Sequence, residues 1–100
     1  MSTPSDTARP WALITGASEG LGKEFAIQLA ERGTHNLILA ARSKAKLDAV
    51  AKAASDQVDC KVIESDLSVA GAAEKLQQQT RNLDVALLIN NAGVAFGGPF

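Results

Sequence analysis

Short apolar runs alternate along the chain with longer stretches in which apolar residues recur at helical spacing. The apolar runs cover residues 11–15, 37–41, 60–63 and 85–89. They are continuous rather than alternating, which is typical of parallel strands that are covered by helices on both faces. The stretches between them predict helices over residues 22–32, 44–54 and about 69–81.

The first predicted helix places Phe25 on its apolar face, together with smaller residues. The third places Val69 and Leu76 on one side, and Gly71 weakens its first turn because glycine is a poor helix former. A glycine favours the end of a helix, and a serine favours its start. The expected end and cap residues are Gly33 for the first helix, Ser43 for the second and Ser68 for the third.

A strand and a helix therefore follow each other three times before a fourth strand. Right-handed crossovers turn this order into an α/β fold, a Rossmann-type doubly wound parallel sheet with strand order 3-2-1-4 and helices on both faces. Residues 1–10 are polar, with two prolines, and we expect a disordered lead-in there. We expect residues 11–100 to form the N-terminal part of a single domain of this type.

The segment between the first strand and the first helix carries the sequence T-G-A-S-E-G-L-G over residues 15–22. Gly16 allows the chain to turn sharply off the strand, and Gly20 leaves room for a phosphate to approach the main chain. Gly22 allows the helix to pack tightly against the sheet. Because the N–H groups of the first helical turn are unpaired and face outward, this segment predicts a pyrophosphate-binding turn.

A phosphate-binding loop of the nucleoside triphosphatase type is the competing interpretation, because Gly22-Lys23 resembles its ending. That loop requires a glycine five residues before Gly22 and a hydroxyl residue after the lysine. Ala17 and Glu24 occupy these positions, so no hydroxyl is present to bind Mg²⁺. The sequence excludes this interpretation.

The choice of dinucleotide is expected to depend on the end of the second strand, where the adenine ribose binds in such folds. Arg42 stands twenty residues after Gly22, and no carboxylate lies beside it. A guanidinium group binds phosphate well, so we predict NADP in preference to NAD, with NAD still possible. The alternative is a solvated arginine at a strand–helix junction. Glu19 lies inside the phosphate turn and is expected to point outward, leaving Ser18 near the ribose or its phosphate.

Two further polar groups follow strands. Asp66 comes after the third strand, where its carboxylate either accepts a hydrogen bond from the adenine amino group or braces the entry to the next helix. Asn90 and Asn91 end the fourth strand, where their amides can seal the strand ends. The small pair Ala92-Gly93 leaves room for a ribose and nicotinamide.

The composition indicates which binding partners and which cellular compartment to expect. The formal net charge is −1, which gives no reason to expect nucleic-acid or membrane binding. No apolar run approaches a membrane span, and residues 1–10 lack the apolar stretch of a signal peptide. The single cysteine, Cys60, fits a reducing compartment and is expected to be a core or edge residue. We therefore expect a cytoplasmic protein without a metal site.

With these residues in view, the chain resembles the short-chain dehydrogenase/reductase family over residues 11–93. Residues 15–22 are similar to its glycine motif, Asp66 to its adenine-contacting aspartate, and residues 90–93 to its N-N-A-G motif. The candidate cofactor-binding residues are Gly16, Ala17, Ser18, Glu19, Gly20, Leu21, Gly22, Arg42, Asp66, Leu67, Asn90, Asn91, Ala92 and Gly93.

The resemblance implies an oxidoreductase that transfers hydride between NADP(H) and a carbonyl or alcohol substrate, as a dimer or tetramer. The family's catalytic asparagine, serine, tyrosine and lysine lie downstream of the N-N-A-G motif, and this chain contains no tyrosine. We therefore expect the N-terminal, NAD(P)-binding part of a longer enzyme, without catalytic residues of its own. Two alternatives remain: a non-catalytic NADPH-binding module, used as a sensor or structural unit, and an interaction domain with a decayed site.

The proposed role of Arg42 is directly testable. Exchanging it for aspartate (Arg42→Asp) replaces a phosphate ligand by a group that repels phosphate and accepts ribose hydroxyls. The ratio of NADPH to NADH affinity should then reverse, as measured by titration with each dinucleotide. An unchanged ratio would contradict the assignment.

Overall fold

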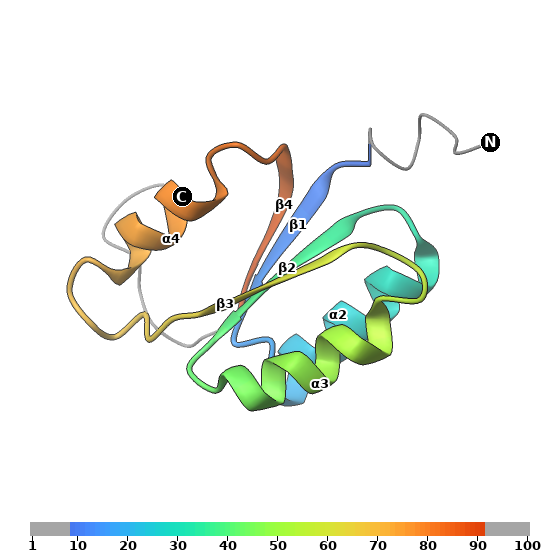
Figure 1. The fold of residues 1–100 in the computed structure, drawn as a ribbon, viewed down its shortest axis with the longest axis horizontal. Helices are drawn as coiled ribbons and strands as arrows, with labels where there is room; N and C mark the ends of the chain where they lie inside the picture. The colour runs from blue at the N-terminus through green and yellow to red at the C-terminus, as the bar shows by residue number, and fades with distance from the viewer. Residues whose placement is uncertain (1–8, 92–100) are drawn as a thin grey trace.

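A computed structural model describes residues 9–91, and within them strands and helices alternate without interruption. The elements are β1 (Trp11–Thr15), α2 (Gly20–Arg32), β2 (Asn36–Ala41), α3 (Lys44–Ala54), β3 (Cys60–Glu64), α4 (Ala72–Thr80) and β4 (Val85–Asn90). Neighbouring strands are parallel, and their order across the sheet is β3-β2-β1-β4 (Figure 1). The predicted strand order is confirmed.

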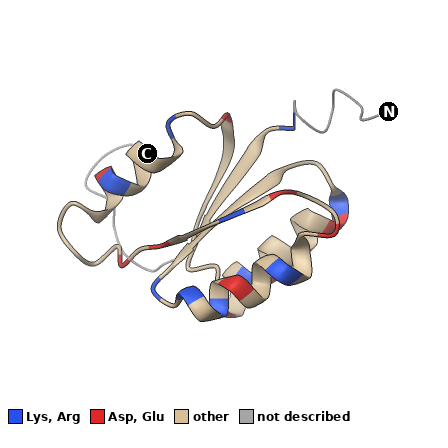
Figure 2. Cartoon of the chain, in the orientation of Figure 1, with Lys and Arg blue, Asp and Glu red and all other residues tan. Residues whose placement is uncertain are grey.

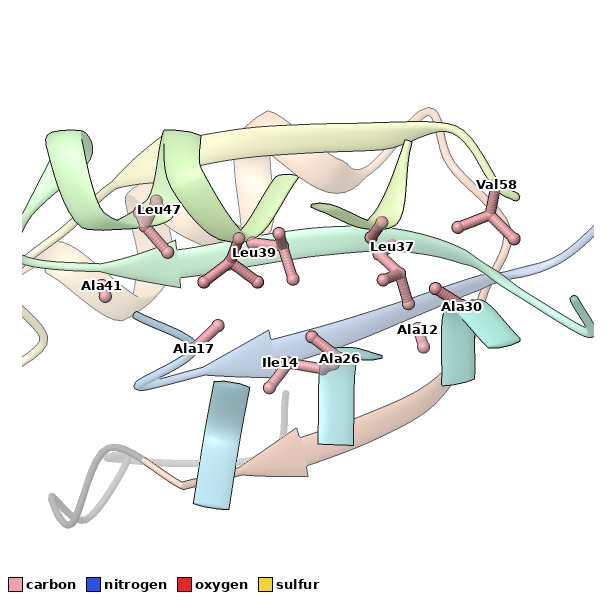
Figure 3. Close-up of a cluster of buried hydrophobic side chains, with 12 residues drawn as sticks. Ala12, Ile14, Ala17, Ala26, Ala30, Leu37, Leu39, Ala41, Leu47 and Val58 are labelled. Carbon is pink, nitrogen blue, oxygen red and sulfur yellow. The ribbon is translucent and has the colours of Figure 1, made fainter. Parts of the chain in front are cut away.

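Helices cover both faces of the sheet, as predicted. α2 and α3 lie on one face and α4 on the other (Figure 1). In the larger core cluster, side chains of β1 and β2 meet those of α2 and α3, as Ile14, Leu39 and Leu47 show (Figure 3). On the opposite face, Leu76 of α4 packs in a smaller cluster with Leu13 of β1.

The two inner strands and the two outer strands differ in burial. β1 from its second residue and β2 throughout are buried, which explains their continuous apolar sequences. In β3 and β4 buried or half-buried residues are interspersed with exposed ones, since successive side chains point to opposite faces of the sheet. Within residues 9–91, each of these two strands has a strand neighbour on one side only. The inner strands thus form the buried centre of the sheet.

A buried amide joins the segments that enter the strands at the opposite edge. The Asn36 side chain is only 3% exposed, and its Oδ1 accepts hydrogen bonds from the Asp59 backbone N–H at 3.0 Å and from Arg9 at 3.2 Å. The backbone N–H of Asn36 donates to the Pro10 carbonyl at 2.8 Å. Segments preceding β1, β2 and β3 are therefore connected at one residue.

Two predicted helix ends are confirmed. Gly33 ends α2 in the left-handed conformation, at φ 69°, and its N–H donates to carbonyls of the last turn. Ser43 caps α3, since its side-chain oxygen accepts a hydrogen bond from the Lys46 backbone N–H at 3.3 Å.

The predicted start of the third helix is wrong. α4 begins at Ala72, after Gly71 in the left-handed conformation, and Val69 is 57% exposed rather than part of the apolar face. Ser68 does not cap this helix. Its N–H and hydroxyl instead donate to the Asp66 carboxylate, so a local turn replaces the first helical turn.

The predicted apolar face of α2 is confirmed at its small residues and is wrong at Phe25. Its buried residues are Gly22, Ala26 and Ala30, whereas Phe25 is 41% exposed. Small side chains on this face allow the helix axis to approach the sheet closely, and the bulky Phe25 lies beside the contact.

Cys60 is a structural residue at the start of β3. It is half-buried, and its thiol donates to the Val58 carbonyl at 3.8 Å. Burial, together with the negative charge of Asp59, raises the pKa of this thiol to about 11. The side chain is therefore a neutral thiol near pH 7, in agreement with the predicted core or edge role.

Some expectations lie outside the described residues, namely most of the lead-in over residues 1–10 and the Ala92-Gly93 pair. None of the helices within residues 9–91 has the length and apolar character needed to cross a membrane.

The core assignment predicts a large difference between two apolar truncations. Leu39 is fully buried in β2, so Leu39→Ala should lower the free energy of unfolding by about 2–5 kcal/mol through lost burial and a residual cavity. Val69→Ala, at an exposed position, should change it by less than about 0.5 kcal/mol. Urea denaturation of the two variants measures both values. Equal losses would contradict the assignment.

Candidate dinucleotide-binding site

A cleft of about 670 Å³ opens at the carboxyl edge of the sheet, where the chain leaves β1, β2 and β3. In open α/β sheets, ligands bind at this edge, beside the point where strand order reverses. The cleft is lined by Gly16, Ser18, Glu19, Ala40, Ala41, Arg42, Ser43, Lys46, Ser65, Asp66, Leu67, Ser68 and Asn91.

The turn after β1 has the geometry that its glycines predict. Gly16 and Gly20 have φ values of 65° and 63°, a left-handed backbone conformation that residues with a side chain rarely adopt. A Cβ at Gly22 would collide with the Gly16 carbonyl oxygen and would lie 2.9 Å from Asn91 Nδ2. The start of α2 is therefore pressed against the turn, at a distance that only glycine permits.

The start of α2 fits an anionic ligand. Glu19 occupies the N-cap position, but its side chain makes no capping hydrogen bond. The first N–H groups of the helix thus lack a side-chain partner there. A Cβ at Gly20 would meet no atom within 4 Å, so open space borders these amides. A diphosphate group suits this combination of open space, N–H donors and helix dipole.

Thr15 fixes the end of β1 to the end of β4. Its hydroxyl lies 3.0 Å from Asn90 Oδ1, to which it donates, and it accepts the Asn91 backbone N–H at 3.0 Å. The Asn91 side chain also donates to the Gly16 carbonyl at 3.5 Å. The two asparagines therefore hold the glycine turn against β4, which is the sealing role expected for their amides.

Arg42 and Asp66 approach the cleft from neighbouring strands. Arg42 is exposed and is the first residue after β2. The Oδ1 atom of Asp66 accepts the Ser68 hydroxyl at 2.6 Å and the Ser68 N–H at 3.0 Å. These bonds, with a contribution from the Arg42 charge, hold the pKa of Asp66 below its ordinary value. The carboxylate thus braces the turn before α4 while it lines the cleft.

Glu19 is exposed, as expected, but it has a partner that the sequence analysis missed. Its Oε2 lies 3.3 Å from Lys46 Nζ in the first turn of α3. Lys46 lines the cleft beside Arg42 and Ser43. The available signal was the predicted cap, because a residue three positions after the Ser43 cap lies in the first turn of the helix, close to the end of β2.

The remaining candidates divide into two groups. Ala17 is fully buried beneath the turn and donates its N–H to the Ala40 carbonyl at 3.2 Å, so it supports the cleft without lining it. Leu21 is 67% exposed on α2 and, like Gly20, Gly22 and Asn90, is not part of the cleft lining. Leu67 lines the cleft and also packs against the smaller core cluster.

Comparison with known proteins agrees with this architecture. The sequence model of the short chain dehydrogenase family matches residues 10–100. The chain is 43% identical over 94 residues to a very-long-chain 3-oxoacyl-CoA reductase of Coccidioides immitis, with 89% of this chain and 27% of the relative covered.

Solved structures give the same result. A short-chain dehydrogenase from Sphingobium yanoikuyae in complex with NADPH superimposes with a TM-score of 0.77 at 39% identity, covering 91% of this chain and 37% of that one. A bulky-bulky ketone specific alcohol dehydrogenase from Comamonas testosteroni gives a TM-score of 0.76 at 38% identity, covering 91% and 38%.

A parallel sheet of order 3-2-1-4 with a glycine turn at its carboxyl edge defines a Rossmann-type dinucleotide-binding architecture. The chain belongs to the short-chain dehydrogenase family. It spans about a quarter of the length of the curated relatives that it matches.

The contact between Gly22 and Gly16 predicts two separable effects of a methyl group. Gly22→Ala forces α2 away from the turn and should lower the free energy of unfolding by about 2–3 kcal/mol, with a loss of dinucleotide affinity. Gly33→Ala places a side chain at positive φ but in open space, far from the cleft, and should cost about 1 kcal/mol without changing affinity. Denaturation and dinucleotide titration distinguish the two; tight binding by Gly22→Ala would contradict the close-approach argument.

Proposed function

We propose that this chain is the NADPH-binding part of a short-chain dehydrogenase that reduces the carbonyl group of a long-chain 3-oxoacyl thioester. The observation that carries the cofactor assignment is the cleft itself. It joins the glycine turn, the uncapped start of α2 and Arg42 at one edge of the sheet.

The described residues would bind and orient the dinucleotide. The amides at the start of α2 would hold the diphosphate, and Arg42 would hold the 2′-phosphate of the adenine ribose. Asp66 would accept a hydrogen bond from the adenine amino group through Oδ2, because its Oδ1 is occupied by Ser68. NADPH supplies a hydride, which together with a proton converts a ketone into an alcohol.

Two observations favour NADPH over NADH. The position after β2 carries the guanidinium of Arg42 and not a carboxylate, and a carboxylate there would repel the 2′-phosphate. In addition, the similar Sphingobium protein was solved with NADPH. Both facts support the preference that the sequence analysis predicts.

The relatives support the substrate class. Very-long-chain 3-oxoacyl-CoA reductases from Coccidioides immitis and from Danio rerio align with 89% of this chain, at 43% and 37% identity. Since these relatives and the similar solved proteins are named as reductases or dehydrogenases, an enzyme is favoured over a non-catalytic module.

The test uses the full-length protein encoded by the gene. Titration calorimetry should show NADPH binding about tenfold or more tightly than NADH, the difference expected from one charge-assisted contact to the 2′-phosphate. With a long-chain 3-oxoacyl-CoA, NADPH should be consumed and the 3-hydroxyacyl-CoA should form. A protein that binds neither dinucleotide contradicts the cofactor assignment. Binding with turnover of simple ketones but not of the thioester contradicts the substrate assignment alone.

A further inference from the structure

The cleft is lined by both basic and acidic side chains. Arg42 and Lys46 are the basic lining residues, and Glu19 and Asp66 are the acidic ones. Figure 2 shows basic positions gathered at the start of α3. Lys46 is held by Glu19 at 3.3 Å, from the opposite side of the cleft entrance.

Lys44, two residues before Lys46, does not share the position of Lys46 beside the cleft. Lys44 belongs to the same first turn of α3 and is similarly exposed, at 64% against 58% for Lys46. Lys44 pairs with Asp48 along the helix at 2.9 Å and does not line the cleft. Only the second of these two lysines is directed across the start of the helix to the glycine turn.

We propose that Lys46 is the second ligand of the 2′-phosphate of NADPH, beside Arg42, and that Glu19 competes with this phosphate for the lysine. The proposal rests on the proposed function, because it assigns a residue to the same cleft. It makes Lys46 a specificity-determining residue and Glu19 a carboxylate that limits the preference for NADPH.

A phosphate is a stronger partner for Lys46 than the Glu19 carboxylate, which supports the replacement of one by the other. The Glu19–Lys46 pair is largely exposed, and exposed ion pairs contribute little to stability, so a ligand can displace Glu19 easily. A phosphate monoester carries up to two negative charges near neutral pH and three acceptor oxygens, against one charge on the carboxylate. The lysine stem is flexible, and the Ser43 cap fixes the backbone from which it extends.

The alternative is that Lys46 only neutralises Glu19 and does not touch the ligand. A double-mutant cycle separates the two roles, because the neutralising role disappears once the carboxylate is removed. The variants are Lys46→Gln, Glu19→Gln, the double variant, and Lys44→Gln as a matched control, all in the full-length protein. Calorimetric titration with NADPH and with NADH measures affinity without turnover, and melting curves confirm folding.

If Lys46 binds the 2′-phosphate, Lys46→Gln weakens NADPH binding about tenfold and leaves NADH nearly unchanged. The loss persists in the Glu19→Gln background, whereas Glu19→Gln alone tightens NADPH binding several-fold. Lys44→Gln has no effect on either dinucleotide.

Two results overturn the proposal in different ways. A loss of NADPH affinity that vanishes in the Glu19→Gln background, or an unchanged affinity of Lys46→Gln, removes Lys46 from the phosphate site while the proposed function stands. A wild-type protein that binds neither NADPH nor NADH removes the proposed function, and this inference with it.

Discussion

The contact between α2 and the turn after β1 is the constraint on which the site depends. Gly22 lies so close to the Gly16 carbonyl that no side chain fits between them, and Asn91 donates to the same carbonyl from the end of β4. This one carbonyl therefore sets the positions of a helix, a turn and a strand relative to one another. Open space borders the amides at the start of α2 in this arrangement.

The sheet could be predicted from the sequence because its inner strands are continuously apolar. β1 and β2 are covered on both faces, and continuous apolar sequences reflect this directly. The start of α4 could not be predicted in the same way. Ser68 has two competing uses, as a helix cap or as the donor to Asp66, and only the neighbouring turn decides between them. Such competition over a few residues leaves no trace in hydrophobic periodicity.

The site shows a similar division between local and distant information. The positions of the glycine turn and of Arg42 beside the cleft could be predicted from the sequence, because each belongs to a strand end whose place follows from the strand order. Glu19 and Lys46 are 27 positions apart on different elements, and their pairing depends on how α3 is oriented toward the turn. The link from Thr15 to Asn90 likewise joins residues 75 positions apart. Contacts of this kind follow from packing and not from spacing.

Asn36 lies at the amino ends of the strands, whereas the cleft lies at their carboxyl ends. Hydrogen bonds of this buried residue, the first of β2, connect it to the segments that precede β1 and β3, at the end of the sheet that faces away from the cleft. The candidate ligand cleft and the hydrogen bonds of Asn36 therefore lie at opposite ends of the same strand, β2. Substitutions in the loops around the cleft can therefore alter its shape and charge while the hydrogen bonds of Asn36, at the far end of β2, stay intact.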